Sequence, residues 1–183
     1  YFSKRVTRAV PDGGPIEAHT NLVKKLDYEC ELAVVLGRDA TDVPAGQTRD
    51  YIFGYTILND VSARDVQTAH KQWYFGKSLD GFTPIGPCIV TADAFADYPP
   101  RLGIRSFVNG EKRQDSNTAL QIFEGGLGMG ELWQGRTRRA GTIMASGTPG
   151  GVGMGMDPPQ FLKPGDVVRC EIEGIGTLTN PVK

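Results

Sequence analysis

The sequence is poor in cysteine, and its three cysteines form no pattern. Cys30, Cys88 and Cys170 are odd in number and widely spaced, so they indicate neither a disulfide framework nor a metal-binding cysteine pair. A reducing, cytoplasmic setting is therefore expected. Long apolar runs are also missing, since none approaches the roughly 20 residues that a membrane helix requires. No signal peptide is visible, and we expect no membrane partner.

An excess of either charge is missing too. The 20 Lys and Arg residues nearly cancel the 21 Asp and Glu residues, which argues against nucleic acid as a partner. Repeats, low-complexity tracts and clear linkers are absent as well. The length of 183 residues predicts one domain, residues 1–183, which can bury roughly two-thirds of its unfolded surface. Because the chain starts at Tyr1 and not at Met, we expect that a natural N-terminal segment is missing.

The chain is rich in turn-forming residues, with 24 Gly and 12 Pro. Pairs such as Pro164-Gly165 separate short apolar runs, which is typical of a β-rich protein. Asn109-Gly110 lies inside residues 105–114 and predicts a tight hairpin there, because both residues tolerate positive φ. The expected strands are Leu26–Leu36, Tyr51–Leu58, Gly86–Thr91, Ile104–Val108, Thr142–Ala145 and Val167–Ile172.

Helical patterns are fewer. Residues 62–73 could form one helix, with Asp60 or Ser62 near its N-cap. Residues 117–133 have helical apolar spacing but contain four glycines within six positions, from Gly125 to Gly130. Each glycine costs about 1 kcal/mol relative to alanine inside a helix. We therefore expect that segment to be broken.

Three acids alternate at the start of the first expected strand. Asp27, Glu29 and Glu31 share one face, because strand side chains alternate with a period of two. Like charges this close disfavour ionisation unless something compensates them, and Mg²⁺ or Mn²⁺ accepts such oxygen ligands. A solvent-facing edge strand with its acids on the wet side is an equally good interpretation of this strand alone.

Three further stretches help to decide between a metal site and a solvent-facing strand. Asp60 ends an apolar strand just before a helix, where sites are often built, although a helix N-cap is the simpler role. Lys77 lies among glycines and apolar residues. It could hold an anionic substrate or an enolate oxygen if buried, or be a solvated surface residue. Residues 146–155, SGTPGGVGMG, could cradle an anion with backbone N–H groups, but they match neither a P-loop nor a dinucleotide fingerprint.

Taken together, these stretches resemble the fumarylacetoacetate hydrolase family, in its C-terminal catalytic domain type, over essentially the whole chain. The resemblance implies an α+β, β-rich fold: a mixed β-sandwich roll with flanking short helices. It also implies a homodimer and one Mg²⁺ or Mn²⁺ per subunit. The matching pieces are Phe2-Ser-Lys4, residues 27–32, 54–55, 59–65 and 84–87, Gln67, Gly76-Lys77 with Asp80, Val108-Asn-Gly-Glu111 with Gln114, Ser116-Asn-Thr118, Gly147-Thr-Pro149 with residues 151–153, and residues 162–166.

The resemblance also implies roles for single residues. The metal ligands would be Glu29, Glu31 and Asp60, while Asp27 would support them or face solvent. Lys77 would be the catalytic residue and would contact the substrate oxygens. For Gln114 and Asn117, a place in the site and a turn-stabilising role both stay open. The expected substrate-binding residues are Arg64, Gln67, Lys77 and Thr148.

The implied substrate is a small 2-oxo acid. The first expectation is a metal-dependent hydrolase that cleaves a carbon–carbon bond in a 2,4-diketo acid, such as an acylpyruvate, fumarylacetoacetate or fumarylpyruvate, through a metal-stabilised enolate. The alternative is a lyase or isomerase on the same scaffold: an oxaloacetate decarboxylase, a 2-hydroxyhepta-2,4-diene-1,7-dioate isomerase or a 5-carboxymethyl-2-hydroxymuconate isomerase. Hydrolysis in the family uses a His–Glu pair on an N-terminal lid. His19 and His70 lie elsewhere, and we expect the lid to be part of the missing segment.

Overall fold

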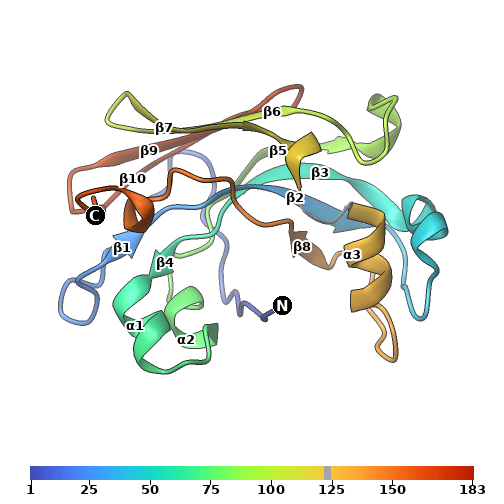
Figure 1. Ribbon diagram of the computed structural model, residues 1–183, viewed down its shortest axis with the longest axis horizontal. Helices are drawn as coiled ribbons and strands as arrows, with labels where there is room; N and C mark the ends of the chain where they lie inside the picture. Colours follow the sequence, from blue (N-terminus) through green and yellow to red (C-terminus); the bar gives the residue numbers. More distant parts are fainter. Residues whose placement is uncertain (122–124) are drawn as a thin grey trace.

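Two four-stranded antiparallel sheets pack face to face (Figure 1). The computed structural model describes residues 1–121 and 125–183. A small third sheet pairs β1 (Leu26–Asp27) with β4 (Ser62–Ala63). The β-rich sandwich with few short helices confirms the expected fold class. The first large sheet has the order β5 (Ile85–Thr91), β3 (Ile52–Asn59), β2 (Cys30–Leu36), β8 (Ile143–Ala145), and the second has the order β10 (Gly176–Pro181), β9 (Val167–Ile172), β6 (Gly103–Val108), β7 (Glu111–Asn117).

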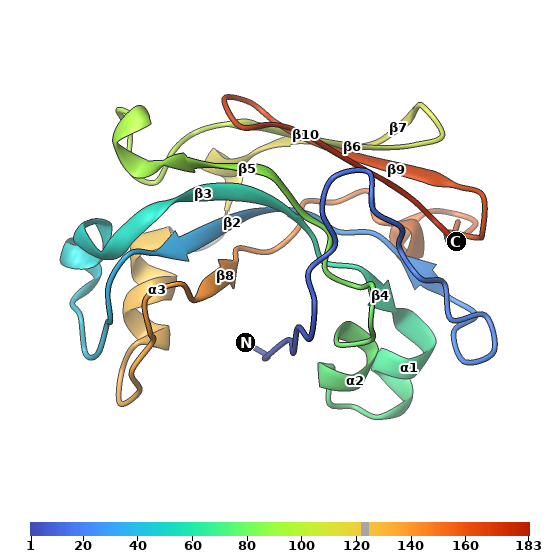
Figure 2. The ribbon, with the colours of Figure 1, turned by 180° about the vertical axis from the view of Figure 1, so that it is seen from behind.

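The hydrophobic core lies between the two large sheets. Leu32 and Val34 of β2 point into it, as do Ile104 of β6 and Val168 of β9, and all belong to one buried cluster. Because strand side chains alternate, Glu31, the residue before Leu32, points to the opposite face of β2. That face looks away from the second sheet, toward the helices and the N-terminal segment (Figure 2).

The expected strand 26–36 is divided in two. β1 ends at Asp27, and β2 begins at Cys30 as a central strand between β3 and β8. Every residue of β2 is buried. The interpretation of an edge strand with acids on its wet side is therefore wrong, because both faces of β2 are covered.

The helices are shorter than the pattern predicted. α1 (Arg64–Ala69) and α2 (Tyr74–Lys77) replace the single helix expected over residues 62–73. The chain turns between them, where Lys71 adopts a φ of 57°. The expected N-cap is also wrong: Ala63 occupies that position, and the Ser62 hydroxyl instead donates to the Asp60 carbonyl. Within the described residues, no helix is long and apolar enough to cross a membrane.

The expected break in residues 117–133 falls partly on residues 122–124, which lie outside the described residues. On either side are a 3₁₀ turn, Thr118–Leu120, and α3 (Gly125–Leu132). The predicted hairpin is confirmed, since Asn109 and Gly110 have φ values of 52° and 83° and connect β6 to β7. The remaining 3₁₀ turns are Ala45–Tyr51, Ala92–Ala94 and Gly153–Gly155.

The packing of α2 against α1 depends on Gly76. A Cβ atom at this position would lie 2.6 Å from the backbone nitrogen of Gln67 and 2.7 Å from its Cα. Backbone atoms cannot move aside as a flexible side chain would, so any larger residue must separate the two helices. Lys77, the next residue, would move with α2.

We predict that Gly76→Ala lowers the free energy of unfolding by about 1–3 kcal/mol, the usual cost of overpacking. Gly46→Ala is the matched control, because its Cβ would meet nothing within 4 Å. Urea denaturation of both variants measures the difference. Equal stability of the two variants would contradict the close packing of α1 and α2.

Candidate metal centre

Antiparallel pairing brings the acids of two strands together. Cys30 at the start of β2 lies opposite Asn59 at the end of β3. Two hydrogen bonds lock this junction: the Asp60 N–H donates to the Glu29 carbonyl at 2.8 Å, and the Glu29 N–H donates to Asn59 Oδ1 at 3.0 Å. Glu29 and Glu31 on either side of Cys30 therefore meet Asp60.

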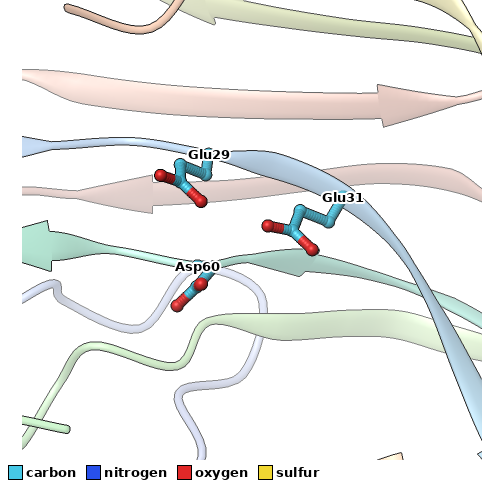
Figure 3. Close-up of side chains that lie close together, drawn as sticks. All are labelled: Glu29, Glu31 and Asp60. Carbon is cyan, nitrogen blue, oxygen red and sulfur yellow. The ribbon is translucent and has the colours of Figure 1, made fainter. Parts of the chain in front are cut away.

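The three carboxylates converge on one point (Figure 3). Glu29, Glu31 and Asp60 each offer one oxygen, and these oxygens all lie within 4.8 Å of one another. All three residues are buried, with exposed fractions of 9%, 2% and 1%. Carboxylate oxygens grouped in this way suit a hard divalent cation such as Mg²⁺ or Mn²⁺, so the donor set fits such an ion. Their role as ligands stays a prediction.

Lys77 lies among these carboxylates and is only 1% exposed, so the interpretation of a solvated surface lysine is wrong. Its Nζ is 2.8 Å from Glu29 Oε2 and 2.7 Å from Asp60 Oδ2. A buried ammonium between two buried carboxylates partly neutralises them. It therefore also competes for the oxygens that a cation would use.

Lys4 is a site residue to which sequence reasoning gave no role. Its Nζ lies 2.6 Å from Asp60 Oδ1 and donates to the Phe82 carbonyl at 2.6 Å. Burial lowers the pKa of Lys4, although Asp60 opposes the shift. The only signal was its place in the Phe2-Ser-Lys4 motif, because the contact to Asp60 spans 56 residues of sequence.

The surroundings of Glu31 disfavour its charged form. Burial raises the pKa of Glu31 well above its usual range, and the negative charges of Asp60 and Glu29 raise it further. The Gly147 N–H donates to Glu31 Oε2 at 2.7 Å and opposes that shift. A divalent cation would favour the ionised carboxylate, which is a physical reason for a cation to bind here.

Arg64 and Gln67 lie together on α1 beside the triad. Arg64 Nη1 lies 2.7 Å from Glu29 Oε1 and donates to Gln67 Oε1 at 3.2 Å. Both side chains are buried. The guanidinium is thus fixed beside one of the triad acids, with Gln67 one helical turn further on.

Thr148 does not contact the triad itself, although its neighbour Gly147 does. The Thr148 hydroxyl donates to the Cys30 carbonyl at 3.1 Å and accepts from Gln114 Nε2 at 2.8 Å. Gln114 is fully buried. Its Oε1 accepts from the Cys30 N–H at 3.2 Å and from the Ser106 hydroxyl at 2.8 Å. Gln114 therefore links the second sheet to Thr148, a function that its place in a hairpin did not reveal.

Other polar residues make contacts outside the triad. Asn117 Oδ1 accepts from the Ala119 N–H and caps a 3₁₀ turn. His19 Nε2 lies 2.8 Å from the Asp80 carbonyl, and His70 Nδ1 lies 2.9 Å from the Val66 carbonyl.

The Phe2 ring lies beside Lys77 and packs against the Trp73 ring. The Phe2 ring centroid is 5.2 Å from Lys77 Nζ and 5.4 Å from the Trp73 ring centroid. Phe2 is 38% exposed and Trp73 is 48% exposed. Sequence reasoning did not single out these rings as part of the site, because they come from segments about 70 residues apart. Through Phe2, this aromatic pair lies next to the lysine that contacts the triad.

We predict that Lys77→Met makes the stability of the protein depend more strongly on a divalent cation. Breaking a buried ion pair costs about 3–5 kcal/mol. In the variant Lys4 and Arg64 still pair with Asp60 and Glu29, and a cation would replace the positive charge that Lys77 supplied between them. Thermal unfolding with a chelator and with Mg²⁺ measures both effects. Lys112→Met, which removes an exposed lysine paired with Asp115, should respond like the unsubstituted protein. Equal Mg²⁺ stabilisation of the two variants would exclude Lys77 as a competitor for the triad.

The chain matches a known family model from its first residue to its last. Residues 1–183 match the C-terminal domain of fumarylacetoacetate hydrolase. The solved fumarylacetoacetate hydrolase of Exiguobacterium antarcticum is 47% identical with a TM-score of 0.91, over 94% of this chain and 62% of that one. The 2-hydroxyhepta-2,4-diene-1,7-dioate isomerase of Mycobacterium marinum is 41% identical with a TM-score of 0.83, over 94% of this chain and 64% of that one.

A curated relative bears on the reaction. Oxaloacetate tautomerase YisK of Bacillus subtilis is 42% identical over 181 residues, which is 99% of this chain and 60% of that protein. The chain thus spans less than two thirds of the relatives that it matches. The Exiguobacterium protein bears the family's name, but the tautomerase and the isomerase contradict our expectation of a carbon–carbon hydrolase. That expectation was wrong because a carboxylate triad with a lysine supports any enolate reaction, with or without water.

The match along the full chain, together with the relatives of more than 40% identity, is decisive: the protein belongs to the fumarylacetoacetate hydrolase family.

Proposed function

We propose that this chain is the catalytic domain of a divalent-metal-dependent isomerase that interconverts the enol and keto forms of a small 2-oxo acid. One observation carries the proposal: three buried carboxylates converge beside a buried lysine ammonium. The tautomerase and isomerase relatives support the same class of reaction.

Glu29, Glu31 and Asp60 would hold the cation, which we propose to be Mg²⁺ or Mn²⁺. Their oxygens lie close enough to share one ion, and an all-oxygen donor set favours these metals over zinc or copper. When bound, the cation supplies Lewis acidity that stabilises negative charge on the 2-oxo oxygen and its neighbouring carboxylate.

Lys77 is the proposed catalytic residue. Enol–keto exchange moves one proton between the oxygen on C2 and the carbon C3, so negative charge develops on that oxygen as the proton leaves. The ammonium of Lys77 lies beside Glu29 and Asp60, where it could donate a hydrogen bond to the oxygen as the charge grows. A donor fixed in advance stabilises the transition state more than the ground state.

The proposed substrate-binding residues surround this point. Arg64 and Gln67 lie together on α1 beside Glu29 and would bind a substrate carboxylate. A guanidinium is well suited to this because its planar donors match a carboxylate. Thr148 would contribute after its hydroxyl turns from the Cys30 carbonyl, and the Phe2–Trp73 pair would cover the apolar side of a small substrate.

We expect the full-length protein with Mg²⁺ to accelerate ketonisation of oxaloacetate enol or of a 2-hydroxy-dienedioate, followed by ultraviolet absorbance. Lys77→Met should lower kcat by about 10²–10³, the cost of losing one transition-state donor, while the protein still binds Mn²⁺. Lys112→Met should keep full activity, since Lys112 lies in an exposed ion pair on β7. Near-normal turnover by Lys77→Met with metal bound would remove Lys77 from the mechanism. Inactivity of the unsubstituted protein on every enol would overturn the proposed reaction.

We also propose that the protein is a homodimer, on the family resemblance. Light scattering at micromolar concentration should give twice the mass of the chain, and the 183-residue chain itself has a mass of 19.8 kDa. A measured mass equal to a single chain would contradict the dimer.

A further inference from the structure

A fourth acid lies next to the two glutamates but takes no part in the triad. Asp27 of β1 is fully buried, and each of its oxygens accepts two hydrogen bonds. Oδ1 accepts from the N–H of Tyr28 at 2.9 Å and of Gly153 at 2.7 Å. Oδ2 accepts from the Met154 N–H and from Arg64 Nε, each at 2.9 Å. With four donors around it, the carboxylate has no oxygen left over for a metal ion.

Two of these four bonds come from the glycine-rich stretch 146–155. The sequence indicated that its backbone N–H groups could cradle an anion, and the anions that they contact here are side chains of the protein itself. Gly153 and Met154 bind Asp27, and Gly147 binds Glu31. A Cβ on Gly153 would lie 2.8 Å from Asp27 Oδ1 and 2.0 Å from the Gln160 carbonyl, so only glycine lets the backbone come this close. Figure 1 shows this orange segment passing beside β1.

The hydrogen bond between Arg64 and Asp27 connects Asp27 to the candidate metal centre. Asp27 holds the Nε edge of the guanidinium, while Nη1 of the same group reaches Glu29 Oε1 at 2.7 Å. Arg64 is therefore shared between an acid outside the triad and an acid inside it. Because a guanidinium is planar, fixing one edge also fixes the direction of the other.

We propose that Asp27 is a positioning residue, which sets Arg64 against Glu29 and ties the Gly153–Met154 backbone to β1. For its part in turnover, the proposal rests on the function proposed above. Without the negative charge of Asp27, the Arg64 guanidinium is free to rotate and to pair with Glu29 through two of its N–H groups. A bidentate pair of that kind occupies both oxygens of a carboxylate. Glu29 would then be a poorer partner for a cation.

The direct test is Asp27→Asn, which keeps the shape of the side chain. Its amide NH₂ would face two N–H donors, Met154 and Arg64, in place of an acceptor. We expect Mn²⁺ affinity, measured by isothermal titration, to fall about tenfold or more, the usual effect of losing a partner that orients a metal ligand. In an Arg64→Met background the same substitution should change Mn²⁺ affinity no further, because Asp27 acts through Arg64.

Asp166→Asn is the matched control for the loss of a buried structural acid. Asp166 is 7% exposed and braces a turn, accepting from Asn109 Nδ2 and from the Lys163 N–H at 2.9 Å each. Both asparagine variants should lower the melting temperature, but only Asp27→Asn should weaken Mn²⁺ binding. If Asp27→Asn does not fold, Asp27→Ser removes the charge and leaves room for a water molecule.

Normal Mn²⁺ affinity in a folded Asp27 variant would overturn the proposal. The proposal would also be overturned if the loss of Mn²⁺ affinity in the Asp27→Asn, Arg64→Met double variant equalled the sum of the losses in the two single variants. Mn²⁺ binding by the unsubstituted protein without turnover of any enol would overturn only the proposed function. Turnover and metal binding that survive Asp27→Asn unchanged would overturn only the role of Asp27.

Discussion

The site depends on neutralising carboxylates that the fold has buried. Asp27, Glu29, Glu31 and Asp60 are each at most 9% exposed, and an isolated buried charge costs several kcal/mol. Two lysines, one arginine and several backbone N–H groups offset this cost. Apart from the Tyr28 N–H beside Asp27, these groups come from other segments of the chain. The packing of the N-terminal segment, α1, α2 and the glycine stretch is therefore tied to these four buried carboxylates.

Hydrophobic periodicity and turn-forming residues predicted the features that depend on neighbouring residues in the sequence. The alternation of Glu29 and Glu31, the apolar strand ending at Asp60 and the Asn109-Gly110 turn all appear in the structure, because each depends on neighbours within a few residues. The helix over residues 62–73 failed because Lys71 takes a left-handed backbone conformation, which no propensity scale assigns to lysine. Lys4, Phe2 and Gln114 reach the site across 56 to 84 residues of sequence, and pairing over such distances leaves no local pattern.

The residues of the triad and Lys77 do not distinguish hydrolysis from isomerisation. Both reactions pass through an enolate, and both use a cation and a fixed ammonium to stabilise it. Hydrolysis also requires a base that activates water. The two histidines in the chain bond to backbone carbonyls of Asp80 and Val66. A sequence pattern built on the enolate machinery alone therefore leads equally well to either reaction.

The position of Lys77 between Glu29 and Asp60 has a consequence for how the protein is made. Many small metalloproteins fold only around their ion, because nothing else holds the ligands together. Here the chain carries its own counter-ions, so the strands can pair and the helices can pack before any metal arrives. If the site binds the proposed Mg²⁺ or Mn²⁺, maturation would be an exchange of the Lys77 ammonium for the metal ion at a finished site, and its rate would depend on how quickly the Lys77 side chain moves away.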